Sequence, residues 1–72
     1  MNLDLKLPKT QSLSFNYDKE ADVLYLSFGE PKAAITLDCG NDFLLRYDET
    51  DQEIKGITLL NFFQKIKNGL SE

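Results

Sequence analysis

With 72 residues, the chain is long enough for one small domain but too short to enclose a large active-site cavity and keep a full core. Twelve Asp and Glu residues against eight Lys and Arg residues give a net charge of −4. This charge argues against nucleic-acid binding, because attraction to phosphate dominates that affinity. The single cysteine, Cys39, excludes an internal disulfide and suggests a reducing compartment.

No apolar run approaches the roughly eighteen residues that a membrane helix needs. Asp4 and Lys6 interrupt the apolar residues at the start of the sequence, which is unlike a signal peptide. We therefore expect a protein that does not enter a membrane and that is cytoplasmic.

Residues 1–12 form the first predicted element, an N-terminal arm or edge strand. Leu3, Leu5 and Leu7 alternate with polar residues, as in a strand, and Pro8 ends the pattern. The pattern leaves open whether this arm pairs within its own domain or swaps to another copy of the chain.

Residues 13–60 are predicted to form an antiparallel β-meander of five strands, or six with the arm. The alternating segments are 12–18, 22–28, 33–38, 43–48 and 54–60. Short turns separate them, and parallel pairing would need long crossovers, so neighbouring strands should be antiparallel. The segment 22–28 is apolar on both faces, which predicts an interior strand. Gly56 is expected to mark a bulge or a close backbone approach.

Residues 61–69 change to a helical period. Asn61 is the predicted N-cap, and Gln64 three residues later would complete a capping box. Three apolar residues at helical spacing share one side: Phe62, Phe63 and Ile66. A helix of about two turns is unstable alone, so we expect it to pack on one face of the sheet. The predicted fold is a single α+β domain that is mainly β.

With the helix on one face, apolar residues on the other face need a second cover. This cover could be the N-terminal arm, strong curling of the sheet or a second subunit, and we favour the second subunit, which would make the protein a homodimer. The predicted interface residues come from the sheet and the arm: Val23, Tyr25, Leu44, Leu3 and Leu5.

Residues 17–26, YDKEADVLYL, resemble the Y-D-x-E-A-D-x-L-Y-I signature of a family of small prokaryotic proteins of unknown function, DUF2283. The matching residues are Tyr17, Asp18, Glu20, Ala21, Asp22, Leu24 and Tyr25. Residues 47–48 and 56–59 match the family's second motif, although the turn between them lacks its usual Gly and Thr58 replaces an acidic residue. The resemblance implies a small β-rich fold and a prokaryotic origin, and it brings no catalytic residues. Small proteins of this kind are suspected members of toxin–antitoxin pairs.

The residues that could carry chemistry favour structural interpretations. Asp18, Glu20 and Asp22 could bind a divalent cation or act as an acid–base pair, but we interpret Asp18 and Asp22 as caps of backbone N–H groups in a turn. The acidic residues 48–53 lack the Gly and the spacing of a calcium loop. Cys39 has no His to activate it, because the chain contains none. We expect no catalytic, cofactor or metal site.

These observations favour a non-enzymatic, homodimeric protein-interaction module. An antitoxin-like role would use the acidic surface to neutralise a basic protein partner. The alternative is a small-ligand or metal-binding protein with its site at the dimer interface. An enzyme that uses Asp22 or Glu20 together with Tyr25 is a third possibility.

Overall fold

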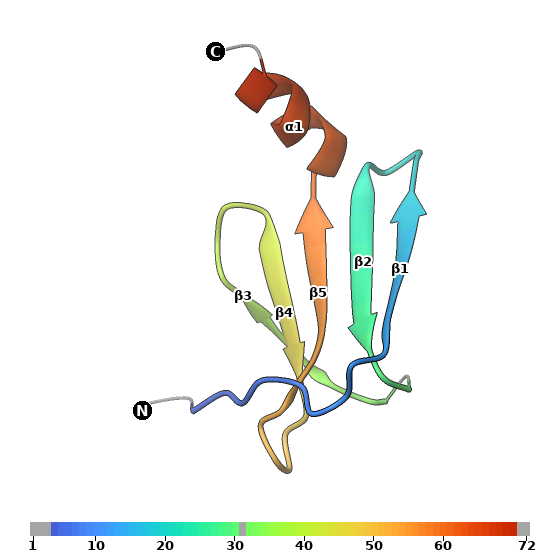
Figure 1. Ribbon diagram of the computed structural model, residues 1–72. Coiled ribbons are helices and arrows are strands. Elements are labelled where there is room, and N and C mark those ends of the chain that lie inside the picture. The colour runs from blue at the N-terminus through green and yellow to red at the C-terminus, as the bar shows by residue number, and fades with distance from the viewer. Residues whose placement is uncertain (1–3, 31, 71–72) are drawn as a thin grey trace.

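The computed structural model describes residues 4–30 and 32–70 and shows one antiparallel sheet followed by a short helix (Figure 1). The strands are β1 (Leu13–Asp18), β2 (Val23–Phe28), β3 (Ile35–Asp38), β4 (Phe43–Tyr47) and β5 (Ile54–Leu60), and the helix is α1 (Phe62–Leu70). The predicted fold class, five antiparallel strands with a short C-terminal helix, is confirmed. No helix in the described part of the chain is long and apolar enough to cross a membrane.

The order of the strands across the sheet is β1-β2-β5-β4-β3, so the last strand lies in the middle. Strands β3, β4 and β5 form a three-stranded meander, and β5 then returns to pair with β2. A fully sequential meander would instead place β3 beside β2. Strand β2 is interior, with β1 on one side and β5 on the other, which agrees with its two apolar faces.

The centre of β5 approaches its neighbour closely at Gly56. A Cβ atom on this residue would lie 2.8 Å from the backbone oxygen of Leu26 on β2. On the other side of β5, the β4 register shifts between Arg46 and Tyr47. Gly56 therefore marks both a close backbone approach and an irregular register, as its position in a strand predicted.

The N-terminal arm forms no strand within residues 4–12. Lys6 instead makes an isolated parallel bridge just before β5: its N–H donates to Gln52 O at 2.9 Å, and Ile54 N–H donates to Lys6 O at 3.0 Å. The arm therefore lies against the turn between β4 and β5 (Figure 1). Of its two predicted interface residues, Leu5 is half-buried, and Leu3 lies outside the described residues.

Helix α1 occupies a different place from the one we expected. It follows β5 beyond the end of the sheet and lies near the turn between β1 and β2, without crossing the middle of a sheet face (Figure 1). The ring of Phe62 meets that of Tyr17 edge-on, with the centroids 6.0 Å apart. Phe63 and Ile66 stay 54% and 42% exposed. The helix therefore leaves both faces of the sheet uncovered along most of their length.

Candidate functional site

The two faces of the sheet differ in chemistry. The cross-strand register places one set of apolar side chains together on what we call the apolar face: Leu13, Phe15, Tyr17, Leu24, Leu26, Phe28, Ile35, Leu37, Phe43, Leu45, Tyr47, Ile57 and Leu59. Alternate residues form the mixed face: Ser14, Asn16, Asp18, Val23, Tyr25, Ser27, Thr36, Asp38, Leu44, Arg46, Gly56, Thr58 and Leu60. None of the residues assigned to the apolar face is charged; Lys55, two residues before Ile57 on β5, lies at the register shift and pairs with Glu53.

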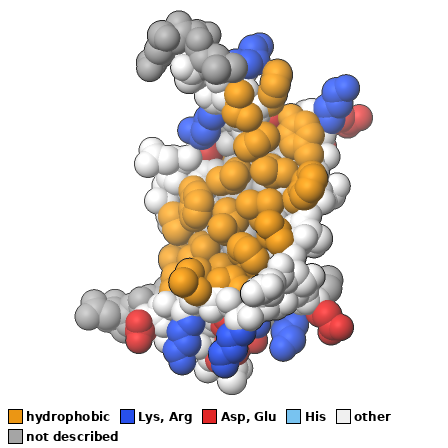
Figure 2. All heavy atoms as spheres, in the orientation of Figure 1, with side chains coloured by type: hydrophobic (Ala, Val, Ile, Leu, Met, Phe, Trp, Pro, Cys, Tyr) orange, Lys and Arg blue, Asp and Glu red, His pale blue; other side chains and the backbone are white. Residues whose placement is uncertain are grey.

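The apolar face is uncovered. Figure 2 shows hydrophobic side chains that gather across the strands and continue to the helix end of the molecule. At the β1 edge, Leu13 and Phe15 are 55% and 74% exposed. Among the described residues only two apolar side chains, Val23 and Leu45, count as buried. A contiguous exposed apolar surface of this kind is a candidate interaction site.

Three of the predicted interface residues lie together on the mixed face, as their alternation predicted. Val23 is buried, Leu44 is half-buried, and Tyr25 is 42% exposed. Polar residues surround them, including Arg46 and Thr36. The structure therefore offers less exposed apolar surface here than on the opposite face, which the sequence pattern had assigned to the helix.

Asp22 connects the turn between β1 and β2 to the start of α1. Its carboxylate accepts hydrogen bonds from the Tyr17 hydroxyl at 2.6 Å, the Phe63 N–H at 2.8 Å and the Gln64 N–H at 3.1 Å. Its backbone oxygen accepts the Phe62 N–H at 3.1 Å. These bonds satisfy the first N–H groups of the helix, which have no partner within it. Asp22 therefore acts as the helix cap, although Phe63 lies 41 residues later in the chain.

The hydrogen bond between Tyr17 and Asp22 shifts the pKa of both groups. It is the largest cause that lowers the pKa of the Asp22 carboxyl below its ordinary value, and the helix N–H groups add to the effect. The same bond is the largest cause that raises the pKa of the Tyr17 hydroxyl. The aspartate is therefore held in its charged form and the tyrosine in its neutral form.

Asn61 directly precedes α1, and its backbone oxygen accepts the Lys65 N–H at 3.0 Å, but its side chain does not cap the helix as predicted. This residue has a left-handed backbone with φ of 52°, and its side-chain amide donates to Asp42 at 3.2 Å. Gln64 donates to Asn68 at 3.4 Å, so the predicted capping box is not formed. Asp42 also pairs with Lys65 at 3.4 Å. The turns before β2 and before β4 therefore each supply an aspartate that holds the helix.

The remaining motif residues have structural positions. Asp18 caps the turn as predicted, because its carboxylate accepts the N–H groups of Glu20 at 3.1 Å and Ala21 at 3.2 Å. Glu20 and Ala21 themselves are exposed. Leu24 belongs to the apolar face, and Tyr25 belongs to the mixed face. The structure therefore explains the aspartates and the first tyrosine of the motif as parts of a turn and a helix cap.

A buried ion pair near the arm was not predicted. Glu53 and Lys55 form a 3.0 Å ion pair, with side chains only 10% and 12% exposed. The Glu53 carboxylate also accepts the Lys9 N–H of the arm at 3.5 Å. The hydrogen bond to Glu53 is the largest cause that raises the pKa of Lys55. The sequence pattern that could have predicted this pair is the spacing of its opposite charges, because residues two apart in extended chain share a face.

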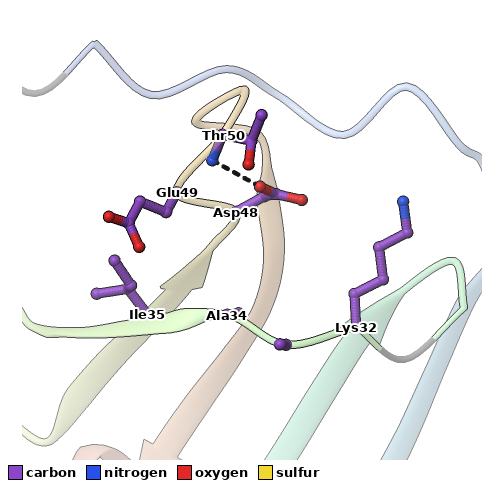
Figure 3. Close-up of a pocket in the computed structure, with 7 residues that line it drawn as sticks. Lys32, Ala34, Ile35, Asp48, Glu49 and Thr50 are labelled. Carbon is purple, nitrogen blue, oxygen red and sulfur yellow. Dashed lines mark hydrogen bonds between the residues drawn. The ribbon is translucent and has the colours of Figure 1, made fainter.

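A groove of about 530 Å³ lies between the turn that follows β4 and the segment that precedes β3 (Figure 3). Lys32 lies on one side of it and Glu49 on the other, while the Asp48 carboxylate accepts the Thr50 N–H at 2.7 Å. Within the described residues, no three side chains of the metal-binding types come together. Cys39 is exposed, and its thiol donates to a backbone oxygen two residues away. The apolar face is therefore the stronger candidate for a functional site.

The comparisons agree with the resemblance seen in the sequence. A family model described as "Protein of unknown function (DUF2283)" matches residues 14–62. This span runs from the second residue of β1 to the first residue of α1, so it includes the rest of the sheet and the Asp22 turn. No curated protein and no solved structure matches the chain.

Proposed function

This chain belongs to the DUF2283 family, and we propose that it is a protein-interaction module without catalytic activity of its own. The observation that carries the proposal is the uncovered apolar face. The broad side of the molecule measures 41 by 28 Å, which is a surface for a polypeptide rather than for a small ligand. A soluble domain rarely leaves so large an apolar patch in water, so another polypeptide is the cover we propose.

The charge distribution supports a basic protein as one partner. The net charge is −4, and the carboxylates gather in the turns at the two ends of the sheet. Those in turns or at strand ends are Asp18, Glu20, Asp22, Glu30, Asp38, Asp42, Asp48, Glu49 and Asp51. An apolar centre with a charged rim is the common anatomy of protein interfaces, in which rim charges speed the encounter with an oppositely charged partner. We propose an antitoxin-like role in which this acidic rim neutralises a basic protein.

Native mass spectrometry of the protein purified from its source cells tests the proposal. We expect a complex that contains a second, basic polypeptide and dissociates as the salt concentration rises, because salt screens exposed charges. A retained metal or small molecule with no polypeptide would contradict the proposal and favour the ligand-binding alternative. A chain that carries neither would also contradict the proposed basic partner.

Charge-removing variants sharpen this test once the partner is in hand. Replacement of two exposed rim residues, Glu20→Gln with Glu49→Gln, should slow association with the basic partner. Lys19→Gln, in the same turn as Glu20, is the matched control and should not slow it. Equal association rates for all three proteins would show that the acidic rim does not steer the partner.

A further inference from the structure

We infer that the polypeptide covering the apolar face is a second copy of this chain, packed face to face so that the two sheets form a sandwich. This inference rests on the proposed function, because it names the occupant of the same surface. It concerns the apolar centre and leaves the acidic rim free for the basic partner.

The first argument is that a single copy has only one layer. Stable domains bury the apolar face of a sheet against a second layer, either another sheet or helices. Here α1 lies beyond the end of the sheet, and no large side chain among the described residues is fully buried. The missing layer must therefore be present whenever the chain is folded. A second copy of the chain meets that requirement, because every cell that makes one copy also makes others.

The size of the surface fits this cover. A stable interface buries roughly 800 Å² on each partner. The broad side of the whole molecule, sheet and helix together, measures 41 by 28 Å, so an interface of that size needs both the apolar face and the exposed side of α1. Two sheets packed face to face would align their strands within about 30° and interleave the side chains of their inner faces.

The charges on the molecule are compatible with a copy at this face and place the attraction for a basic partner elsewhere. Two copies with a net charge of −4 repel each other, yet the residues of the apolar face carry no charge. A two-fold arrangement would bring apolar residues together and leave the acidic turns at the ends of the sheets in water. A basic partner, in contrast, is attracted to the rim.

Helix α1 enlarges this surface. Phe63 and Ile66 are exposed, and a groove of about 250 Å³ separates Ile66 from Phe43 and Leu59 of the apolar face. Figure 2 shows that the hydrophobic surface continues to this end of the molecule. In the sandwich, the groove receives side chains of the second copy.

Two aspartate substitutions test which face is covered. Phe15 and Tyr25 are both exposed aromatic residues on neighbouring strands, but Phe15 belongs to the apolar face and Tyr25 to the mixed face. Sedimentation equilibrium should show a dimer for the wild type. Phe15→Asp should raise the dimer dissociation constant by about 30-fold or more, because each copy loses an aromatic side chain that anchors the interface. Tyr25→Asp, the matched control, should change it by less than about twofold.

Isotope-filtered nuclear Overhauser spectra provide a second measurement that needs no substitution. In a sample of mixed labelled and unlabelled wild-type chains, cross-copy contacts should involve the methyl groups of Leu13, Leu26 and Leu37. Cross-copy contacts from Val23 or Leu44 instead, or dissociation by Tyr25→Asp alone, would overturn the inference.

The two proposals can fail separately. A monomer that binds a different polypeptide over Leu13 and Leu37 would overturn the second copy and leave the interaction module standing. A dimer with the expected contacts but no basic polypeptide in native mass spectra would support the sandwich and contradict the antitoxin-like role.

Discussion

The apolar and mixed faces use alternate residues of the same five strands, yet only the mixed face shields its central residues with its own long side chains. Its centre is Thr58, which is only 8% exposed because Tyr25 and Leu44 flank it across the neighbouring strands. Gly56, next along the face, is buried beside the Arg46 side chain. Long side chains with apolar stems and polar tips can cover a sheet face in this way.

Only two side chains of the apolar face, Tyr17 and Tyr47, end in a polar group. Its outer residues, Leu13 and Phe15 on β1 and Leu37 on β3, are exposed hydrocarbon with no polar tip. The comparison shows that amphipathic side chains can shield a sheet face from water, whereas the outer hydrocarbon side chains of the apolar face stay exposed in the single chain.

The largest expected effect is a loss of stability, which we compare between the buried apolar side chain of each face. Leu45→Ala on the apolar face should cost about 2–5 kcal/mol of unfolding free energy, because it removes packed methyl groups and leaves a cavity. Val23→Ala on the mixed face removes fewer atoms and should cost less. Urea unfolding followed by circular dichroism, at one protein concentration for all variants, measures both. A larger loss of unfolding free energy for Val23→Ala would contradict the prediction that the buried residue of the apolar face contributes more to stability.

A smaller loss of stability is expected from adding a methyl group at Gly56 on the mixed face. Gly56→Ala should cost about 1–3 kcal/mol, because the added methyl group would lie 2.8 Å from the Leu26 oxygen and force the strands apart. Ser27→Ala, its cross-strand neighbour on the same face, should be nearly neutral. The same urea titrations compare the two. Equal stabilities for both variants would mean that β2 and β5 are less closely packed than the structure shows.

The smallest effect concerns the helix cap at the end of both faces. Tyr17→Phe removes the largest cause of the lowered Asp22 pKa, so this pKa should rise towards its ordinary value of 3.8. A lowered folded-state pKa contributes stability above the unfolded value, and that stability is lost as the pH falls through the folded value. The variant should therefore lose its helix cap at a higher pH than the wild type does.

A carbon-detected NMR titration of the Asp22 carboxyl measures this shift directly. The Asp48 carboxyl, whose pKa is lowered mainly by the Thr50 N–H, serves as the internal control. Its pKa should be the same in both proteins. An Asp22 pKa that does not move would show that the tyrosine hydroxyl does not hold the charged form.

The strands and the helix could be predicted from the sequence because their patterns are local. Alternation located β5 at Ile54–Leu60, and the change of period placed the helix within one residue of its start. The order of the strands was not local information. Turn residues such as Gly29 show where β2 ends, but they do not show that the next strand, β3, lies at the far edge of the sheet.

The helix position and the candidate interface could not be predicted for a related reason. The cap of α1 comes from Asp22, and no spacing near Asn61 reveals it. The bonds to Asp22 and Asp42 hold the helix beyond the sheet end, so the face assigned to it stays open. Our prediction of an interface at Val23, Tyr25 and Leu44 depended on that assignment. The structure moves the candidate to the opposite face.

The remote cap also has a consequence for the order of folding. A nine-residue helix is marginal in water, and Asn61 offers it no local start. The acceptors that stabilise its first turn exist only after β2 and β5 have paired and brought Asp22 beside Phe63. We therefore expect α1 to become stable only after the long-range pairing of β2 with β5.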